Sequence, residues 1–598
     1  MDAYRFVWDE DPPHFDEAHL HIRSQCGLCC QTIHPNEWAI ALLNSHRKMY
    51  GVRPEYCTKR FRFPRTPGAI THTDWYPLYC HCLFLQTYPK KPVLERLWVA
   101  AVWRTPWIMS SLKPKIQLDV VDNELVSISL PTAEILGLPQ LTALPSEVLQ
   151  LIKAYSRGSV IWSYPAIKAR AEEMAMFDER MSESDDMQYE LSIVKKWHRG
   201  QDAELDEKPP QSVVFRFTLD SHGLLDIERL PNWPEYESCR YRTHKYFLLG
   251  FAEAQRTWVY FKFGHARIIP SPSWPRPLQF WDIPSPPTKG LEFLLRPRRT
   301  DATCNRTLDL RNITGITFFY YRGALMGLHS HALGAVTAFP TVKDTLSKYE
   351  PYLVWIYIPV PHGDRIMRFG LRTWRNEHEE PATHHTSLLM TTKLGGDFSL
   401  GPSFDMEDQN FLFQGTPTVL VHNTPIKGGI TLLGLAGDEP QESLPAARFP
   451  IISISSDQLA YGGNAITVDI SLKGAVRIDI FRHSYTGHLR GFLLEYENGS
   501  QRTAGQCRVG VDPVTVCHKP VSFCYRKIPW GELDEHQNYE LVCCSETGDQ
   551  HSGHRSPHGP WTCSDFGVYA KVWCNDASTE LYTYTPNSQE FITIDDST

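Results

Sequence analysis

The 598-residue chain lacks several features that would place it in a well-defined class. Its first residues, MDAYRFVWDEDPPHFDE, are acidic and do not contain the apolar stretch of a secretory signal. No run of about 18 apolar residues occurs, so we expect no membrane-spanning helix and no membrane partner. Lys and Arg form no basic block and the net charge is −8, which argues against nucleic acid as the main partner. We therefore expect an intracellular protein of the cytoplasm or nucleus.

The sequence motifs of common enzymes are also missing. No GxSxG, Walker A, GxGxxG at the end of a strand, HExxH or kinase signature is present. Because the chain has 68 carboxylates, some acid pair would always look catalytic, and we nominate none. The sequence therefore predicts that this protein is not an enzyme.

The composition is that of a folded protein with several domains. Hydrophobic residues make up 42 % of the chain and charged residues 21 %, which is typical of globular and not of disordered proteins. The length predicts roughly two to four domains. The 44 prolines, 37 glycines and 12 % aromatic residues favour many short strands and turns over long helices.

Changes in composition divide the chain into segments. We expect an acidic arm at 1–20, a Cys/His-rich head at 21–115, a helical module at 116–181, a polar linker at 182–210, and a β-rich region in two parts at 211–380 and 381–598. The head carries short helical patterns, for example at 37–50. From residue 211, apolar and polar residues alternate in segments such as TWVYFKF and YLVWIYIPV, which predicts strands. The predicted class is α+β, with a mainly helical head and a large all-β sandwich, prism or propeller.

Two stretches of the β-rich region, 308–331 and 468–496, share an order of elements. Each has an apolar-Asp-apolar strand, then an alternating strand that ends at Arg322 or Arg482, then a turn and a second strand. Each stretch therefore predicts a β-hairpin. A duplication and a chance likeness between hairpins both explain the similarity.

The head contains cysteines at the spacing of a zinc knuckle. Cys26 and Cys29 are separated by two residues. The candidates for the second pair of ligands are Cys57, His72, Cys80, His81 and Cys82, and we nominate Cys80 and Cys82. Zinc would stabilise a module with a small core. The alternatives are buried structural thiols, which pack as small hydrophobic groups, and a redox pair. We expect no other cofactor.

His329 and His331 stand two residues apart on a predicted strand, so their side chains share one face. That face could bind a metal or a sugar. The alternative is a pair of half-buried or solvated histidines at the end of a strand.

The stretch LTALPSEVLQLI, at 141–152, predicts a helix. Pro145 suits the first turn, where its missing N–H would have no partner in any case. Glu147 stands near the positive end of the helix dipole. The residues at helical spacing that make the apolar face are Val148, Leu149, Leu151 and Ile152. Such a helix either docks on a partner or belongs to the core of an ordinary domain.

Several segments together resemble a group of fungal F-box-type proteins of largely unknown function. The segment LPSEVLQLIKAYSRGSVIW, from Leu144 to Trp162, is similar to a degenerate F-box. The CxxC head, the TGITFF strand, the His-x-His, the RGFLLEYENG hairpin and the GQCRVGVD segment are also similar to that group. Gly158 interrupts the helical pattern and Pro165 limits its continuation, so the module is shorter than a typical F-box.

The resemblance implies an adaptor for a Skp-cullin ubiquitin ligase. Its β-rich half would hold a protein substrate of unknown identity, and the F-box-like helices would dock on a Skp-type adaptor. The docking residues that it implies are Leu144, Pro145, Val148, Leu149, Ile152 and Trp162. The alternative function is a glycan- or ligand-binding β-rich protein in which the F-box-like helix is purely structural.

Overall fold

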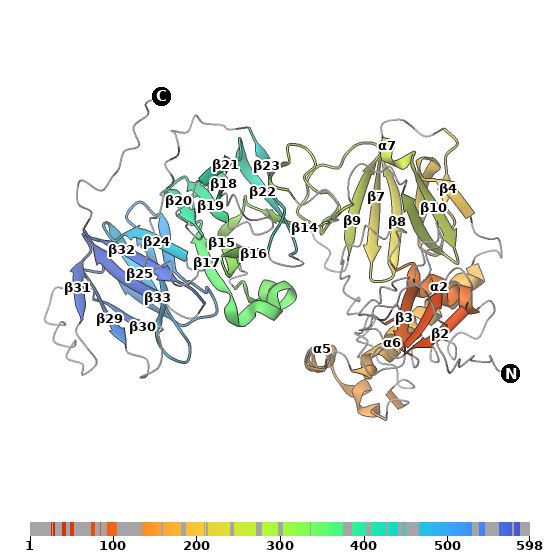
Figure 1. Ribbon diagram of the computed structural model, residues 1–598, viewed down its shortest axis with the longest axis horizontal. Helices are drawn as coiled ribbons and strands as arrows, with labels where there is room; N and C mark the ends of the chain where they lie inside the picture. Colours follow the sequence, from red (N-terminus) through yellow and green to blue (C-terminus); the bar gives the residue numbers. More distant parts are fainter. Residues whose placement is uncertain are drawn as a thin grey trace, which may run out of the picture. The chain divides into compact units, whose positions relative to one another are not determined.

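The structure is a computed structural model, and it divides the chain into two compact units (Figure 1). Unit 1 is Met1–Pro286 with Arg298–Cys304, and unit 2 is Pro287–Pro297 with Asn305–Thr598. Up to residue 180 the described residues are 26, 28–29, 39–43, 48–52, 73–77, 84, 93–104, 133–134, 137–156 and 159–180. From 187 to 585 all are described except 209, 211–212, 240–243, 271–277, 297–302, 335–336, 375–385, 402–407, 426–428, 440–446, 448, 450–465, 529–537, 545–560 and 577–578.

Strands dominate the described residues and helices are few, which confirms the β-rich character expected from the sequence. Within these residues we find no helix with both the length and the apolar character needed to cross a membrane. The boundary between the two units lies between 286 and 305.

The described part of the head contains more strand than helix. Strands β1 (Ala39–Leu43), β2 (Lys48–Val52) and β3 (Thr73–Pro77) form a sheet in the order β2-β1-β3, and α2 (Val93–Val102) comes after them in the chain. The helix predicted at 37–50 is therefore wrong in its described part. Short apolar runs such as AIALL suit either structure, and here β1 pairs with a strand on each side.

Helices occupy the segment that was predicted to be helical from Leu144 onward. A 3₁₀ turn (Pro139–Ala143) leads into α5 (Ser146–Tyr155), and α6 (Val160–Arg180) is the next helix. Pro165 lies inside α6 and does not end it. The buried side of α6 carries Ile167, Ala171 and Met174, which pack against Leu97 and Ala100 of α2.

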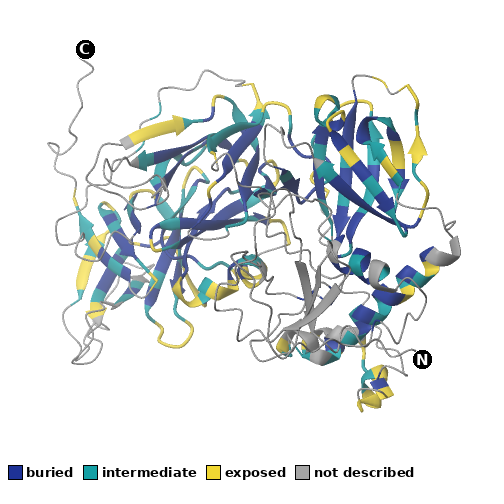
Figure 2. Ribbon diagram, turned by 45° about the vertical axis from the view of Figure 1, so that its right-hand side comes forward, coloured by how far each residue is buried: buried dark blue, intermediate teal, exposed yellow. Residues whose placement is uncertain are grey.

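The rest of unit 1 is a β-sandwich. Its larger sheet has the order β6-β5-β8-β7-β9-β12 and its smaller sheet the order β11-β10-β4. The strands are β4 (Met187–Glu190), β5 (Val194–His198), β6 (Glu204–Leu205), β7 (Val214–Asp220), β8 (Gly223–Leu230), β9 (Lys245–Gly250), β10 (Thr257–Lys262), β11 (His265–Pro270) and β12 (Gln279–Trp281). The core between the sheets is rich in phenylalanine: Phe217 stacks on Phe247 at 4.2 Å between ring centroids, and Phe261 packs from the smaller sheet. Figure 2 shows buried residues along these strands.

The segment predicted as a linker, 182–210, contains β4, β5 and β6 of this sandwich. Lys195, Lys196 and Glu204 are exposed, whereas Leu191, Val194 and Trp197 are buried in the core and Arg199 is buried in the ionic group described next. The apolar residues of this segment are few among polar ones, so the polar composition concealed them.

A buried ionic group joins α6 to the sandwich of unit 1. Arg199 donates two hydrogen bonds to Asp220, at 2.8 and 2.5 Å. Arg170 pairs with Glu173 on α6 at 2.5 Å, and Glu173 also accepts from His222 at 3.1 Å and Arg199 at 3.5 Å. Because each charge has a partner of opposite sign, the group can lie in the interior.

Unit 2 contains two successive sets of strands. The first set, which we call the first β module, runs from β14 to β23, and the second β module runs from β24 to β33 (green to teal and blue in Figure 1). β13 (Glu292–Leu295) pairs with β23 at the edge of the first module.

The strands of the first module are β14 (Thr303–Asp309), β15 (Ile313–Tyr321), β16 (Ala324–Ala332), β17 (Val354–Pro359), β18 (Ile366–Trp374), β19 (Thr386–Thr392), β20 (Gly396–Leu400), β21 (Asp408–Leu412), β22 (Thr416–Asn423) and β23 (Leu433–Asp438). Short helical turns at 339–352 connect β16 to β17.

The strands of the second module are β24 (Ile466–Ser471), β25 (Ala475–Arg482), β26 (Leu489–Tyr496), β27 (Gln501–Gly505), β28 (Val514–His518), β29 (Ser522–Ile528), β30 (Asn538–Cys544), β31 (Thr562–Asp565), β32 (Tyr569–Cys574) and β33 (Thr579–Tyr584).

Apart from β13 and β20 in the first module and β27 in the second, the two modules pair their strands in the same order. The pairings β14-β22-β23, β16-β15-β17 and β19-β18-β21 of the first module are matched by β24-β32-β33, β26-β25-β28 and β30-β29-β31 of the second. Both predicted hairpins, β15–β16 and β25–β26, are present. Each hairpin also has two register shifts in the same places, at Ile313/Gly315 and Phe319/Tyr320 in one and at Ala475/Arg477 and Phe481/Arg482 in the other. This agreement supports duplication over chance likeness.

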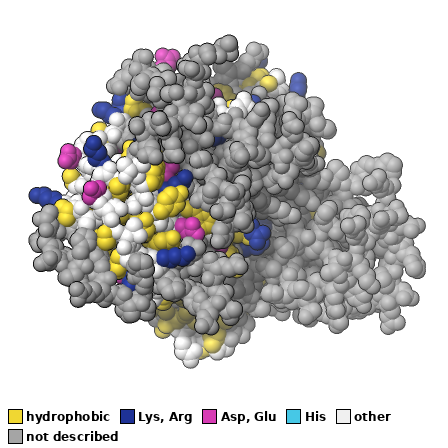
Figure 3. Space-filling view, turned by 60° about the vertical axis from the view of Figure 1, so that its left-hand side comes forward, with side chains coloured by type: hydrophobic (Ala, Val, Ile, Leu, Met, Phe, Trp, Pro, Cys, Tyr) yellow, Lys and Arg dark blue, Asp and Glu magenta, His cyan; other side chains and the backbone are white. Residues whose placement is uncertain are grey.

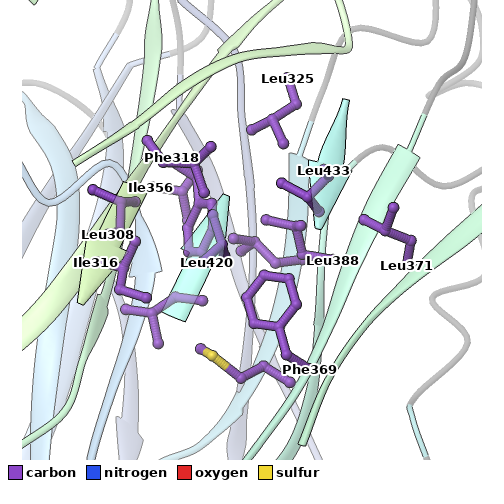
Figure 4. Close-up of a cluster of buried hydrophobic side chains, with 14 of the residues drawn as sticks. Leu308, Ile316, Phe318, Leu325, Ile356, Phe369, Leu371, Leu388, Leu420 and Leu433 are labelled. Atoms are coloured by element: carbon purple, nitrogen blue, oxygen red, sulfur yellow. The ribbon is translucent and has the colours of Figure 1, made fainter. Parts of the chain in front are cut away.

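Each module has an apolar core, and the first core also takes in Ile466 and Cys574 from the second module. The first is built around residues such as Phe318, Phe369 and Leu388, which point toward one another from different strands (Figure 4). The second is built around Ile480, Phe492 and Phe523.

Candidate functional site

Helix α5 exposes an apolar face to solvent. Val148, Leu151 and Tyr155 stand at positions i, i+3 and i+7, so they lie on one side of the helix. Their exposed fractions are 38 %, 58 % and 91 %. A ten-residue helix that presents three large apolar side chains on one side is suited to docking in an apolar groove of a partner.

The neighbouring apolar side of α5 packs against the protein and holds the helix in place. Leu149 and Trp162 are buried together with Ala133, and Leu144 and Ile152 pack partly against them. The helix ends at a polar corner: the indole N–H of Trp162 donates to Ser156 Oγ at 2.9 Å, and Ser156 Oγ donates to the carbonyl of Ile152 at 2.5 Å. The residues of α5 therefore divide into a packed side and a solvent side.

The residues that the sequence implied for docking fall on both sides. Pro145 and Val148 are exposed, Leu144 and Ile152 are half-buried, and Leu149 and Trp162 are buried. Leu151 was counted in the apolar pattern but not among the docking residues. Tyr155 was missed, although its spacing of seven residues from Val148 was a signal that it shares the same side.

The cysteines predicted as zinc ligands are only partly described. Cys26 and Cys29 are buried in an apolar cluster with Leu28, Phe84 and Leu97, and the backbone N–H of Leu28 donates to Cys26 Sγ at 3.3 Å. Cys80 and Cys82 lie outside the described residues. Among the described residues no group of three His, Cys, Asp or Glu side chains could hold a metal. Zinc at this site stays a prediction.

His329 and His331 do share one face of β16, and each is bonded to a threonine. His331 Nε2 lies 2.7 Å from Thr317 Oγ1, and His329 Nδ1 lies 2.8 Å from Thr341 Oγ1. His331 is buried and its ring meets that of Tyr357 edge to face at 5.0 Å. The bond of His329 attaches the helical turns at 339–352 to the sheet, whereas the bond of His331 links β16 to β15 within the sheet.

Charged side chains of both signs are scattered among hydrophobic ones on the described part of the face in Figure 3. No large area of one sign is visible there, in keeping with the spread of Lys and Arg along the sequence.

Comparison with known proteins adds no relative to this geometry. The chain matches no model of a protein family and no curated protein. Its function must therefore be inferred from its own residues, and the exposed side of α5 is the site with the clearest chemical character.

Proposed function

We propose that this chain is a non-catalytic adaptor that docks on a Skp-type adaptor of a cullin ubiquitin ligase through the exposed side of α5. Its β-rich region holds the protein substrate. The observation that carries this proposal is the apolar face of Val148, Leu151 and Tyr155 on a short helix. The F-box-like pattern from Leu144 to Trp162 indicates a Skp-type adaptor as the partner.

Burial of this apolar face against a partner lowers the free energy compared with its exposure to water. Covering a large apolar side chain is worth about 1.5–3 kcal/mol. The packing of Leu149 on Trp162 fixes the helix before a partner arrives, so little ordering entropy opposes docking. The docking residues that we propose are therefore Val148, Leu151 and Tyr155, while Leu149 and Trp162 support them from behind.

The test is binding of the full chain to a purified Skp-type adaptor, measured by titration calorimetry. Leu151→Glu and Tyr155→Glu should each weaken binding at least about tenfold, because truncating or charging a central apolar contact costs more than about 1.4 kcal/mol. Both side chains are exposed, so neither change should alter the melting temperature much.

Met176→Glu is the matched control, since Met176 is half-exposed on α6 and lies outside the proposed face. It should bind like the unchanged protein. Failure of the unchanged chain to bind the Skp-type adaptor would reject the proposal. Equal binding by Leu151→Glu and the control would place any docking elsewhere. Leu149→Asp would not be decisive, because Leu149 is buried and its replacement disturbs the helix itself.

A further inference from the structure

The GQCRVGVD segment, which runs from Gly505 to Asp512, is held by both β modules of unit 2. The Gln506 side chain accepts from the backbone N–H of Trp355 in β17 at 3.1 Å, and its Nε2 donates to the carbonyl of Asn575 at 2.7 Å. Val511 packs against the apolar cluster that contains Trp355. The segment is thus fixed at the junction of the two modules, although it has no regular structure after β27.

Three charged side chains meet at this junction. Arg490 Nε lies 3.4 Å from Asp512 Oδ2, and Arg508 Nε lies 3.9 Å from Asp512 Oδ1. The side chains of Arg490 and Arg508 are 17 % and 20 % exposed and that of Asp512 is 4 % exposed. Two guanidinium groups therefore share one carboxylate in a largely buried place that still reaches solvent.

A backbone bulge orients the side chain of Arg490, and a contact with an aromatic ring orients that of Arg508. Arg490 is the extra residue of the bulge in β26, between Gly491, which pairs with Phe481, and Leu489, which pairs with Arg482. A bulge redirects the side chain that it carries. Arg508 lies over the ring of Trp355, 4.7 Å from its centroid. Neither guanidinium has to be ordered by a ligand.

The contacts inside this group are incomplete. Both Arg–Asp distances exceed the 2.7–2.9 Å of a charge-assisted hydrogen bond. Within the described part of the chain, Nε of Arg490, Nε of Arg508 and Oδ2 of Asp512 are buried without a hydrogen-bond partner. Burial, and then the charge of Arg508, lowers the pKa of Arg490, while Asp512 opposes this. Burial also lowers the pKa of the neighbouring His483, and both arginines add to the effect.

We propose that Arg490 and Arg508 form an anion-binding site for a phosphate-like oxyanion. The group as it stands has an excess positive charge, and an oxyanion would neutralise it and accept the hydrogen bonds that Asp512 does not. Asp512 positions the two guanidinium groups from behind. The loop His483–His488 joins β25 to β26 and ends two residues before Arg490, so it lies beside the site. This site is independent of the docking face on α5.

The first β module supplies the variant that tests the site. Met326 is the bulge residue of β16, because its neighbours Gly327 and Leu325 pair with Phe319 and Tyr320. It thus corresponds to Arg490, so Arg490→Met introduces a side chain that the same bulge already accommodates. Arg508→Lys keeps the charge but removes the planar fork of donors. Arg477→Gln, in the exposed part of β25, is the control.

The measurement is the melting temperature of the full chain against concentration of inorganic phosphate, with sodium chloride at matched ionic strength. The unchanged protein and Arg477→Gln should show a saturable rise. Arg490→Met and Arg508→Lys should need at least about tenfold more phosphate for the same rise. No saturable rise in the unchanged protein, or an equal rise in Arg490→Met, would overturn the proposal.

Two further measurements test where phosphate binds and which kind of phosphorylated ligand the site prefers. Phosphate should change the tryptophan fluorescence of the unchanged protein, and Trp355→Phe should remove that change while phosphate still raises the melting temperature. An unchanged signal in Trp355→Phe would contradict the site at Arg508.

Glucose 6-phosphate and a phosphoserine peptide then distinguish the source of the bound phosphate group. Tighter binding of glucose 6-phosphate indicates a small metabolite, and tighter binding of the phosphoserine peptide indicates a phosphorylated protein.

Discussion

Each unit contains a buried group of arginine and aspartate side chains, and the two groups are joined in different ways. In unit 1, Arg199 donates to both oxygens of Asp220 at hydrogen-bond distance. In unit 2, Arg490 and Arg508 approach Asp512 no closer than 3.4 and 3.9 Å.

The pKa values of the two aspartates differ accordingly. Burial alone raises the pKa of a carboxyl group. At Asp220 the charge and hydrogen bonds of Arg199 outweigh burial and lower the pKa to about 2. At Asp512 burial outweighs both arginines, and the pKa is raised.

The difference shows how the role of a buried ion pair can be inferred. A group whose charges are paired at short distance has its bonding capacity satisfied, and it holds elements together, as α6 is held to the sandwich. A group with two cations and one loosely placed anion is incomplete. Such a group contributes little to the stability of the fold, and its unsatisfied charges are better explained by the binding of a ligand.

The largest expected effect is on stability. Asp220→Asn should lower the free energy of unfolding by about 3–5 kcal/mol, because it removes the closest counter-charge of the buried Arg199 and leaves only Glu173 at 3.5 Å. Asp512→Asn should cost about 1 kcal/mol or less, since folding already disfavours the charge of Asp512. Urea unfolding followed by circular dichroism measures both. Equal losses would remove the distinction between the two groups.

The pH dependence of stability should have opposite signs at the two aspartates. The native pKa of Asp220, about 2, lies below its unfolded value of about 3.9. Its contribution of roughly 2–3 kcal/mol is therefore present above pH ~4 and lost as the pH falls toward 2. The native pKa of Asp512 is raised, so the contribution of Asp512 to stability falls as the pH rises from about 4 through that pKa.

Unfolding free energies across pH, compared for the unchanged protein, Asp220→Asn and Asp512→Asn, separate these terms. Asp220→Asn should flatten the acid side of the profile and Asp512→Asn the part above pH ~4. A profile that Asp512→Asn leaves unchanged would show that its carboxyl group has an ordinary pKa.

The two bulges give a smaller effect. A Cβ on Gly491 would lie 2.6 Å from the carbonyl oxygen of Ala504 and 2.7 Å from the backbone nitrogen of Gln506, and neither atom can move easily. Gly491→Ala should therefore cost about 1–3 kcal/mol and loosen the GQCRVGVD segment. A Cβ on the corresponding Gly327 would meet the end of the Leu346 side chain at 3.0 Å, which can turn aside, so Gly327→Ala should cost less than about 1 kcal/mol.

Thermal melting of the two alanine variants measures this difference. If Gly327→Ala were the more harmful, the backbone of the second module would be more adaptable at its bulge than that of the first, and the fixed position of Arg490 would be in doubt.

The smallest effect is expected at an exposed ion pair. Arg477 lies 2.7 Å from Asp479 on β25, but its side chain is 37 % exposed. Arg477→Gln should change the unfolding free energy by less than about 1 kcal/mol, because water screens such pairs. A larger loss, measured in the same urea series, would mean that exposure is a poor guide to which arginines matter here.

Strands that alternate clearly could be predicted from the sequence, and so could the hairpins at 308–331 and 468–496 and the start of α5. The pattern failed where an apolar run is too short to distinguish a helix from a strand: AIALL is a strand because β2 and β3 pair with it. It also failed where apolar residues are sparse, as at Leu191 and Trp197 in the supposed linker. Periodicity shows that a helix is amphipathic, but it does not show which of two adjacent apolar sides is covered.

The junction site was visible only as separate segments. Arg490 and Asp512 both stood in motifs noted in the sequence, RGFLLEYENG and GQCRVGVD, yet no spacing rule brings them together. Their meeting depends on a bulge in β26 and on contacts with Trp355 from the other module. Such three-dimensional coincidences have no local signature in a sequence.

The bulge in each hairpin has a consequence for how this chain could evolve. Its extra residue takes no part in the ladder pairs, so the residue there can be exchanged without changing the strand register. One copy of the hairpin has a thioether at Met326, which seals an apolar interior, while the other has a guanidinium at Arg490. Duplication thus allows one copy to preserve the scaffold while the same point in the other is open to selection for new chemistry.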